Sequence, residues 1–272
     1  MVRSILDDCL HSRQVLSISN AVTGVVLGAA VGILAIGRAL AAARGLNAKH
    51  AVKQVDRLLS NQKLDMKEML EAWVPYALGG RKEALVALDW TEFDRDGHST
   101  IAAYLVTSHG RATPLYWKTV GKDALSDGGR TDEETSLLHD LRDALPEDVK
   151  VTLLADRGFS DVALFQTLDE WSWAYVIRSK KNIYVTDKKG LSQPMEAWLP
   201  ASRRATKLAE PKVTKNQVPV GAVVVVHAKD MAEPWYLVSS LSEATATQIV
   251  KLYGRRFTIE ETYRDQNDPR FG

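Results

Sequence analysis

The chain has 272 residues, of which 45% are hydrophobic and 25% are charged, as in ordinary globular proteins. Its 9 prolines and 17 glycines are too few for a fibrous or disordered chain. The formal net charge is +1, so binding to a nucleic acid would depend on local clusters of basic residues. The single cysteine, Cys9, excludes an internal disulfide framework and is typical of a reducing compartment such as the cytoplasm.

Residues 1–80 are predicted to be helical, because they form long segments rich in Ala and Leu that end at Gly79-Gly80. Within them, residues 21–37 (AVTGVVLGAAVGILAIG) carry no charge. This run lies at the lower length limit for a membrane span, and its glycines make it weakly hydrophobic. We favour packing inside a small helical domain over a membrane helix, and we expect no membrane partner.

A basic stretch follows this run and is opposed only by Asp56; its members are Arg38, Arg44, Lys49, His50, Lys53 and Arg57. One interpretation is a solvated helix face. The other is contact with a DNA backbone, because phosphate contact needs clustered positive charge rather than a basic whole protein.

After residue 80 the pattern changes to strands and helices in the order β-β-β-α-β-α-β. The predicted strands are 84–90, 99–108, 112–120, 150–156 and 173–179, and the predicted helices are 131–145 and 161–168. This is the order of a ribonuclease H-like α/β core, in which the first and fourth strands lie side by side.

The rest of the chain is predicted to be a β-rich insertion followed by one long helix that begins near Thr245. The predicted domains are therefore a helical N-terminal domain (1–80), the first part of the core (81–179), the insertion (180–243) and the closing core helix (244–272). The insertion carries basic clusters that include Lys180, Lys181, Arg203 and Arg204.

Two aspartates stand where a metal site would need them. Asp89 and Asp156 each follow an uninterrupted apolar run, so both carboxylates are expected at the same edge of the sheet. Neighbouring carboxylates repel unless a cation compensates, and such oxygen ligands suit Mg²⁺ or Mn²⁺. The simpler interpretation is that each aspartate only ends a strand and starts a turn.

A third acid strengthens the metal-site interpretation. Tyr253, Arg256 and Glu260 are spaced to share one face of the closing helix. A helix carboxylate beside two strand-end aspartates could complete a pair of metal sites, as phosphodiester chemistry uses. The alternative is an ordinary amphipathic helix with an Arg–Glu pair.

At these residues the chain resembles a known family. LDWTEF around Asp89, LLADRGFSD around Asp156 and Y-x2-R-x3-E ending at Glu260 resemble the bacterial DDE transposases of the insertion-sequence-four family. AKHAVKQVDRLLSN (48–61) is similar to the helical N-terminal part of that family, which binds the ends of the mobile element.

The resemblance implies an enzyme in which Asp89, Asp156 and Glu260 hold two Mg²⁺ (or Mn²⁺) ions and cleave and transfer DNA strands at terminal inverted repeats. It implies double-stranded DNA as partner, a homodimer on DNA, a bacterial cytoplasm and no small-molecule cofactor. The residues expected to contact DNA are Tyr253, Arg256, Arg157, Lys180, Lys181, Arg203, Arg204, Lys49 and Lys53. For Arg157, a plain surface charge is an equal alternative, and the acidic stretch from Asp123 to Asp148 is expected to face away from DNA.

Two features depart from the family pattern. Asn267 stands where the family signature has a lysine, and the chain ends at Gly272, where relatives continue. A truncated copy is the expectation these features suggest. The alternative function is a non-catalytic DNA-binding remnant that inhibits transposition by an intact relative.

Overall fold

The structure is a computed structural model that describes residues 1–126 and 128–266. Its contacts divide the chain into two compact units. The first contains Met1–Gly80, Asp140–Pro146 and the residues from Glu260 onward, and the second contains Arg81–His139 and Glu147–Ile259. The positions of Asn267 and Gly272 lie outside the described residues.

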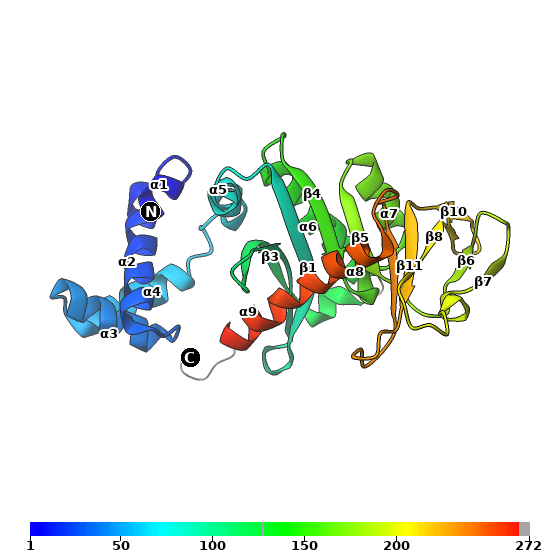
Figure 1. Cartoon of the computed structure of the whole chain (residues 1–272). Helices are drawn as coiled ribbons and strands as arrows, with labels where there is room; N and C mark the ends of the chain where they lie inside the picture. Colours follow the sequence, from blue (N-terminus) through cyan, green and yellow to red (C-terminus); the bar gives the residue numbers. More distant parts are fainter. Residues whose placement is uncertain (127, 267–272) are drawn as a thin grey trace. The chain divides into compact units, whose positions relative to one another are not determined.

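The N-terminal part of the first unit is helical, as predicted (Figure 1). Its helices are α1 (Val2–Leu6), α2 (Ser12–Gly28), α3 (Ile33–Arg44), α4 (Ala48–Leu59) and α5 (Met66–Leu78). Asn47 and Asp65 begin α4 and α5 by accepting a hydrogen bond from a backbone N–H of the first turn. Gly37 allows α3 to pack closely on α4, because a Cβ there would lie 2.5 Å from the Cα of Val52.

The uncharged run 21–37 is divided between α2 and α3. Along the described residues, no single helix is both long and apolar enough to cross a membrane. α2 and α3 meet the criteria of length and composition only together, and the two are bent by 94° at the break. Ala29 ends α2 in the left-handed region, with a φ of 46°.

The second unit is built on an eight-stranded sheet with the order β3-β2-β1-β4-β5-β12-β11-β8. Its strands are β1 (Glu83–Phe93), β2 (His98–Val106), β3 (Ala112–Gly121), β4 (Lys150–Ala155), β5 (Ala174–Arg178), β8 (Thr206–Ala209), β11 (Ala222–Val226) and β12 (Trp235–Ser239). β4 pairs in parallel with both β1 and β5, and the other pairs are antiparallel. The predicted neighbourhood of the first and fourth strands is therefore confirmed.

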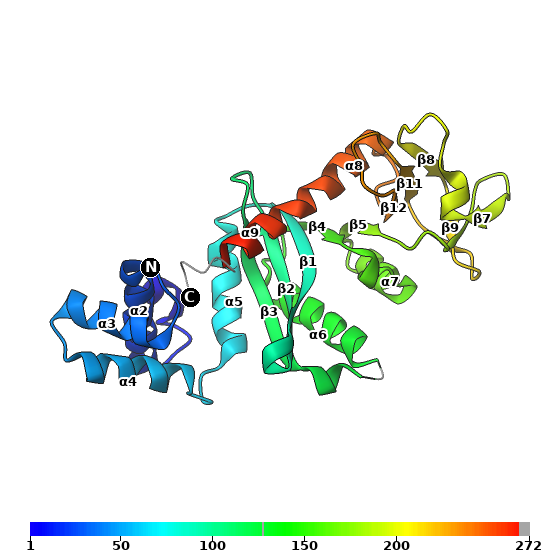
Figure 2. The same cartoon turned by 90° about the horizontal axis from the view of Figure 1, so that it is seen from below.

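Helices cover both faces of this sheet, which explains the long apolar runs in its central strands. α6 (Gly129–Ala144) and α7 (Val162–Glu170) lie on one face, and α8 (Ala246–Gly254) lies on the other (Figures 1 and 2). Asp161 caps α7 by accepting from the backbone N–H of Ala163, at the start of the helix predicted over 161–168. Thr245 caps α8 in the same way, through Gln248.

The segment 180–243 is rich in strands but contributes to two sheets. β8, β11 and β12 extend the main sheet beyond β5, whereas β6 (Tyr184–Thr186), β7 (Ser192–Pro194), β9 (Lys212–Val213) and β10 (Val218–Pro219) form a separate four-stranded sheet. All five residues of β11, AVVVV, are apolar and are buried in the main sheet. A run without polar alternation is typical of a strand covered on both faces.

The closing helix predicted from the sequence is interrupted by a tighter turn. α8 ends at Gly254, a 3₁₀ turn η5 (Arg255–Phe257) follows, and α9 runs over Thr258–Gln266. The backbone stays in the right-handed helical region on both sides of η5. Residues three apart lie on the same face in a 3₁₀ turn, and Tyr253 and Arg256 are both buried.

Candidate active site

Asp89 and Asp156 occupy one row at the ends of two neighbouring strands. Leu88 of β1 pairs with Ala155 of β4, and the next residue on each strand is the aspartate. Side chains in one row of parallel strands point to the same face, and the strands lie about 5 Å apart. Asp156 also raises the pKa of Asp89, as expected for two close carboxylates. The predicted convergence of these two acids is thus a feature of the sheet itself.

Each carboxylate has one oxygen engaged by the protein. Oδ1 of Asp89 accepts from the backbone N–H of Trp90 at 3.0 Å and from the guanidinium of Arg256 at 2.9 Å. Oδ1 of Asp156 accepts from the backbone N–H of Gly158 at 2.8 Å. Within the described part of the chain, the second oxygen of each aspartate has no hydrogen-bond partner. Two carboxylate oxygens at this edge therefore remain available to a ligand.

The electrostatics of Asp89 reflect its burial. Burial raises the pKa of Asp89 above its usual range, the Arg256 guanidinium acts in the opposite direction, and the nearby Asp156 adds to the rise. The Asp89 side chain is 21% exposed and that of Arg256 is 8% exposed. Arg256 is therefore the main compensating charge for a carboxylate that is largely removed from water.

Tyr253 and Arg256, predicted to contact DNA, are buried in the described structure. Tyr253 is 1% exposed and lies in an aromatic cluster with Trp235 and Phe257, with ring centroids 5.0 Å and 6.2 Å away. Burial raises the pKa of Tyr253 to about 12. The Nε of Arg256 is buried and has no hydrogen-bond partner among the residues that the structure describes. Their contact with DNA stays a prediction, and their position beside Asp89 is what the structure adds.

Glu260 is the third residue of α9 and is exposed. By its contacts it belongs to the first unit, whereas Asp89 and Asp156 belong to the second. Among the described residues, no group of three or more His, Cys, Asp or Glu side chains is arranged to hold a metal ion. The chemistry of Asp89 and Asp156 nevertheless fits a divalent cation, because a hard cation prefers carboxylate oxygens and two of theirs are unengaged.

A further acid, Glu134 of α6, lies near this edge and was not predicted. The indole Nε1 of Trp90 donates to Oε1 of Glu134 at 2.8 Å. The guanidinium carbon of Arg130 lies over the Trp90 ring, 4.6 Å from the ring centroid. Because side chains alternate along a strand, Asp89 points to the face of α8 and Trp90 to the face of α6. Glu134 belongs to the acidic stretch 123–148, which is expected to face away from DNA, and its side chain is half-buried.

Burial raises the pKa of Glu134 to about 7, Trp90 and Arg130 oppose the rise, and Asp156 and Asp161 add to it. A carboxyl with a raised pKa stabilises the fold below its unfolded pKa, and this contribution is lost as the pH rises toward 7 and beyond. Glu134→Gln, which keeps the acceptor for Trp90, is therefore expected to be more stable than the wild type at pH 8.5. After allowance for partial exposure the gain is about 1–2 kcal/mol, and it vanishes near pH 4.

Thermal unfolding at both pH values measures this difference. Glu92→Gln supplies a control of opposite sign, because the hydrogen bond from Ser99, with help from Arg130 and Lys122, lowers the pKa of Glu92 to about 2. Glu92→Gln should lose stability at pH 8.5 and lose less as the pH falls toward 2. Equal pH dependence of Glu134→Gln and the wild type would contradict the raised pKa.

The structure gathers some of the predicted basic residues and separates others. Arg157, Lys180 and Lys181 line one cavity of the second unit. Arg203 and Arg204 are exposed on the segment before β8 and are not among the lining residues of that cavity. Lys49 and Lys53 are exposed on α4 of the first unit. Of the nine residues predicted to contact DNA, these seven are exposed, and Tyr253 and Arg256 are buried.

Comparison with known proteins adds a family assignment to this geometry. Residues 81–272 match the model of a family described as "Transposase DDE domain". Two Marinitoga piezophila Argonaute structures, one with guide RNA and target DNA and one with guide RNA, are 9% and 11% identical to the chain, with TM-scores of 0.29 and 0.30. Each match covers 76% of this chain and 30% of the Argonaute chain. The search of curated proteins finds no match.

Proposed function

This chain belongs to the transposase DDE domain family, and on that premise we propose that it cleaves and transfers DNA strands at the terminal inverted repeats of an insertion sequence. The observation that carries the proposal is the Asp89–Asp156 pair, two adjacent carboxylates that each keep one oxygen unengaged. The strand order β3-β2-β1-β4-β5 supports a ribonuclease H-like core under this site. The motifs quoted from the sequence support the insertion-sequence-four branch of bacterial transposases.

In this proposal Asp89, Asp156 and Glu260 would hold two Mg²⁺ or Mn²⁺ ions. Bound there, the ions would supply an activated water and stabilise charge on the leaving oxygen of a phosphodiester. The protein's own part is to hold the carboxylates in place. Gly158 fixes one oxygen of Asp156, and Arg256 together with the Trp90 N–H fixes one oxygen of Asp89.

The proposed partner is double-stranded DNA, bound by a homodimer in a bacterial cytoplasm. The helical N-terminal part would bind the ends of the element through the face of α4 that exposes Lys49 and Lys53. Arg157, Lys180, Lys181, Arg203 and Arg204 would contact phosphates near the cleavage site, because clustered cations release the counterions of DNA. Tyr253 and Arg256, which are buried beside Asp89, would contact DNA phosphates near the cut.

The test is nicking of a supercoiled plasmid that carries the inverted repeats flanking the gene. We expect nicked product with Mg²⁺ or Mn²⁺ and none with EDTA. Binding of the repeats without nicking under any of these conditions would instead favour a non-catalytic DNA-binding protein that competes with an intact relative. Absence of both binding and nicking would overturn the proposal.

A further inference from the structure

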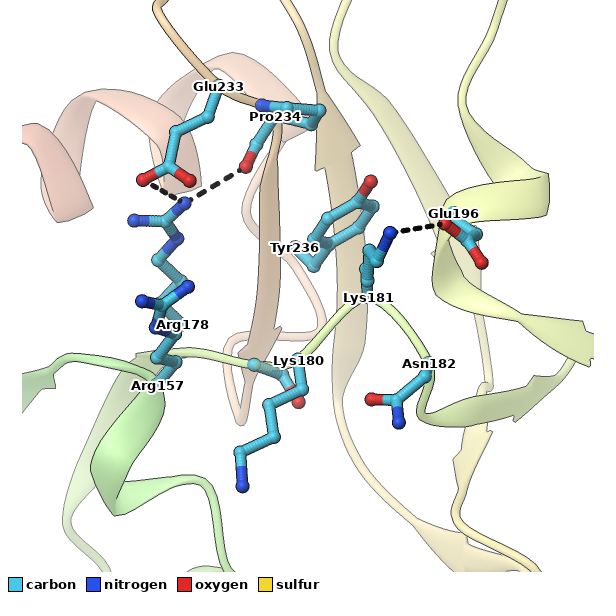
Figure 3. A pocket seen from close by; sticks show the side chains of 10 residues that line it. Arg157, Arg178, Lys180, Lys181, Asn182, Glu196, Glu233, Pro234 and Tyr236 are labelled. Carbon is cyan, nitrogen blue, oxygen red and sulfur yellow. Dashed lines mark hydrogen bonds and ion pairs between the residues drawn. The ribbon is translucent and has the colours of Figure 1, made fainter.

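A cavity with excess positive charge lies in the second unit, and Arg157, the residue after Asp156, is part of its lining (Figure 3). Its volume is ≈ 580 Å³. Its lining includes four basic residues, Arg157, Arg178, Lys180 and Lys181, and two acidic residues, Glu196 and Glu233. Two positive charges are therefore left uncompensated around a hollow that the proposed catalytic role of the aspartates does not use.

The pairing of the strands fixes where this cavity lies relative to the aspartates. Ala155 of β4 pairs with Ile177 of β5, so Arg178 stands in the same row as Asp156. Asp89 stands in that row on the other side of Asp156. With a spacing of about 5 Å between strands, Arg178 lies about 5 Å from the Asp156 position and about 10 Å from that of Asp89.

The Arg178 guanidinium already forms an ion pair with a carboxylate. Nη2 of Arg178 donates to Oε1 of Glu233 at 2.7 Å and to the carbonyl oxygen of Pro234 at 3.2 Å. The Arg178 side chain is 15% exposed, whereas Glu233, on the connection between β11 and β12, is 57% exposed. The hydrogen bond from Arg178, with a smaller effect of Arg157, lowers the pKa of Glu233. Glu233 is thus a charged anion held at its oxygen end by a fixed guanidinium.

The other basic residues of the lining are less restrained. In the described structure Arg157 and Lys180 are exposed and form no ion pair. Lys181 lies 3.4 Å from Glu196, and both side chains are largely solvated. Exposed pairs of this kind contribute little to stability, so they yield readily to another anion. The cavity therefore offers one fixed guanidinium and three adaptable cations.

We propose that this cavity binds the phosphodiester backbone of an unpaired DNA strand next to the cleavage site, and that Glu233 occupies the phosphate position at Arg178 until the strand displaces it. The inference deepens the proposed function and rests on it for the identity of the strand. A guanidinium forms paired hydrogen bonds with a phosphate, whereas it makes one with Glu233, so the exchange favours the phosphate.

The volume of the cavity suits an unpaired strand better than a duplex. Cavities of about 300–1,000 Å³ enclose a small ligand, which corresponds to one or two nucleotides and not to the cross-section of a double helix. The row from Asp89 to Arg178 is about 10 Å long, so one strand can reach from the cavity to the aspartates. In this proposal the strand bound in the cavity is the one cleaved at the aspartates.

The test uses the full chain in EDTA, so that no cleavage occurs, and a fluorescein-labelled 12-nucleotide oligothymidine followed by anisotropy over a salt series. Arg157→Ala and Lys180→Ala are each expected to weaken binding about 3- to 10-fold and to lower the salt slope by about 0.7, the value for one lost phosphate contact on a single strand. Glu233→Gln is expected to tighten binding about 3-fold, because it removes the competing anion. Lys188→Ala, whose exposed partner Glu210 lies outside the cavity, is the control and should bind like the wild type.

Unchanged affinity and slope in Arg157→Ala and Lys180→Ala, or weaker binding by Glu233→Gln, would overturn the proposal. The proposal would also be overturned if these two variants lost affinity for a blunt duplex of the same length but not for oligothymidine. Plasmid nicking by the same preparations separates the two proposals. Wild-type nicking without the expected binding pattern removes the cavity proposal alone, and the binding pattern without nicking removes only the proposed catalysis.

Discussion

Replacing Asp156 with asparagine is expected to lower metal-dependent nicking about 1000-fold or more, because the loss of one carboxylate charge removes several kcal/mol of metal-assisted stabilisation. Asparagine keeps the Oδ1 acceptor for the N–H of Gly158, so the turn after β4 should persist. Binding of DNA that carries the repeats should change less than about 3-fold, because a charge is lost at the cut and not along the backbone contacts. Gel analysis of plasmid topology and an anisotropy titration measure the two effects.

Asp187→Asn is the matched control for this variant. Oδ1 of Asp187 accepts from the N–H of Lys189 and of Leu191, both at 2.9 Å, in a turn of the separate four-stranded sheet. It should nick like the wild type. Retention of nicking by Asp156→Asn within 10-fold of the wild type would contradict a catalytic role for this carboxylate.

Replacing Arg256 with alanine is expected to lower the free energy of unfolding by about 3 kcal/mol at pH 8, because it leaves the Asp89 carboxylate buried without its compensating charge. Arg256 lowers the pKa of Asp89, so in its absence that pKa rises further. A group with a raised pKa loses its stabilising effect as the pH rises, so the defect should be smaller at pH 5 than at pH 8. Urea unfolding of Arg256→Ala and the wild type at pH 5 and pH 8 measures the loss of unfolding free energy at each pH.

Two further variants separate this effect from a simple loss of packing. Asp89→Asn in the Arg256→Ala background should recover much of the stability at pH 8, because both charges are then absent. Lys82→Ala removes an exposed ion pair with Asp148 and should change the unfolding free energy by less than about 1 kcal/mol. A defect in Arg256→Ala that is independent of pH and is not relieved by Asp89→Asn would contradict the charge argument.

The main strands could be predicted from the sequence because their apolar runs are long and their turns are marked. KVTLLAD predicts a buried strand ending at an acid, and the structure places β4 over Lys150–Ala155 with Asp156 directly after it. The connection between the first two predicted strands contains the turn residues DRDG (94–97), and Gly97 there has a φ of 65°. Local pattern decides features of this kind, because apolar periodicity and turn residues act within a few positions.

The pairing beyond β5 could not be predicted in the same way. β12 is antiparallel to β5 although more than 50 residues separate them along the chain. Nothing in the sequence of β12 and the residues around it, PWYLVSS, indicates which strand it pairs with. The choice between the two sheets of the segment 180–243 depends on burial of both faces. That burial is a property of the assembled fold, which the alternation within one short strand does not reveal.

The ion pair of Arg256 with Asp89 and the contact of Glu134 with Trp90 were missed for a related reason. The spacing of Tyr253 and Arg256 predicts a shared face, and it does not say that the face is buried against the sheet. Glu134 lies in a strongly acidic helix, where composition favours solvation. The indole beside it comes from a strand more than 40 positions away, so no local pattern signals the contact.

Binding of Mn²⁺ to the chain without DNA, followed by electron paramagnetic resonance, tests the role of the Asp89–Asp156 pair most directly. The wild type is expected to bind Mn²⁺, and Asp89→Asn and Asp156→Asn are each expected to weaken that binding at least about 10-fold, since each loses one ionised oxygen ligand. Asp187→Asn should bind as the wild type does. Equal Mn²⁺ affinity in the wild type and both strand-end variants would contradict the assignment of these carboxylates to a metal site.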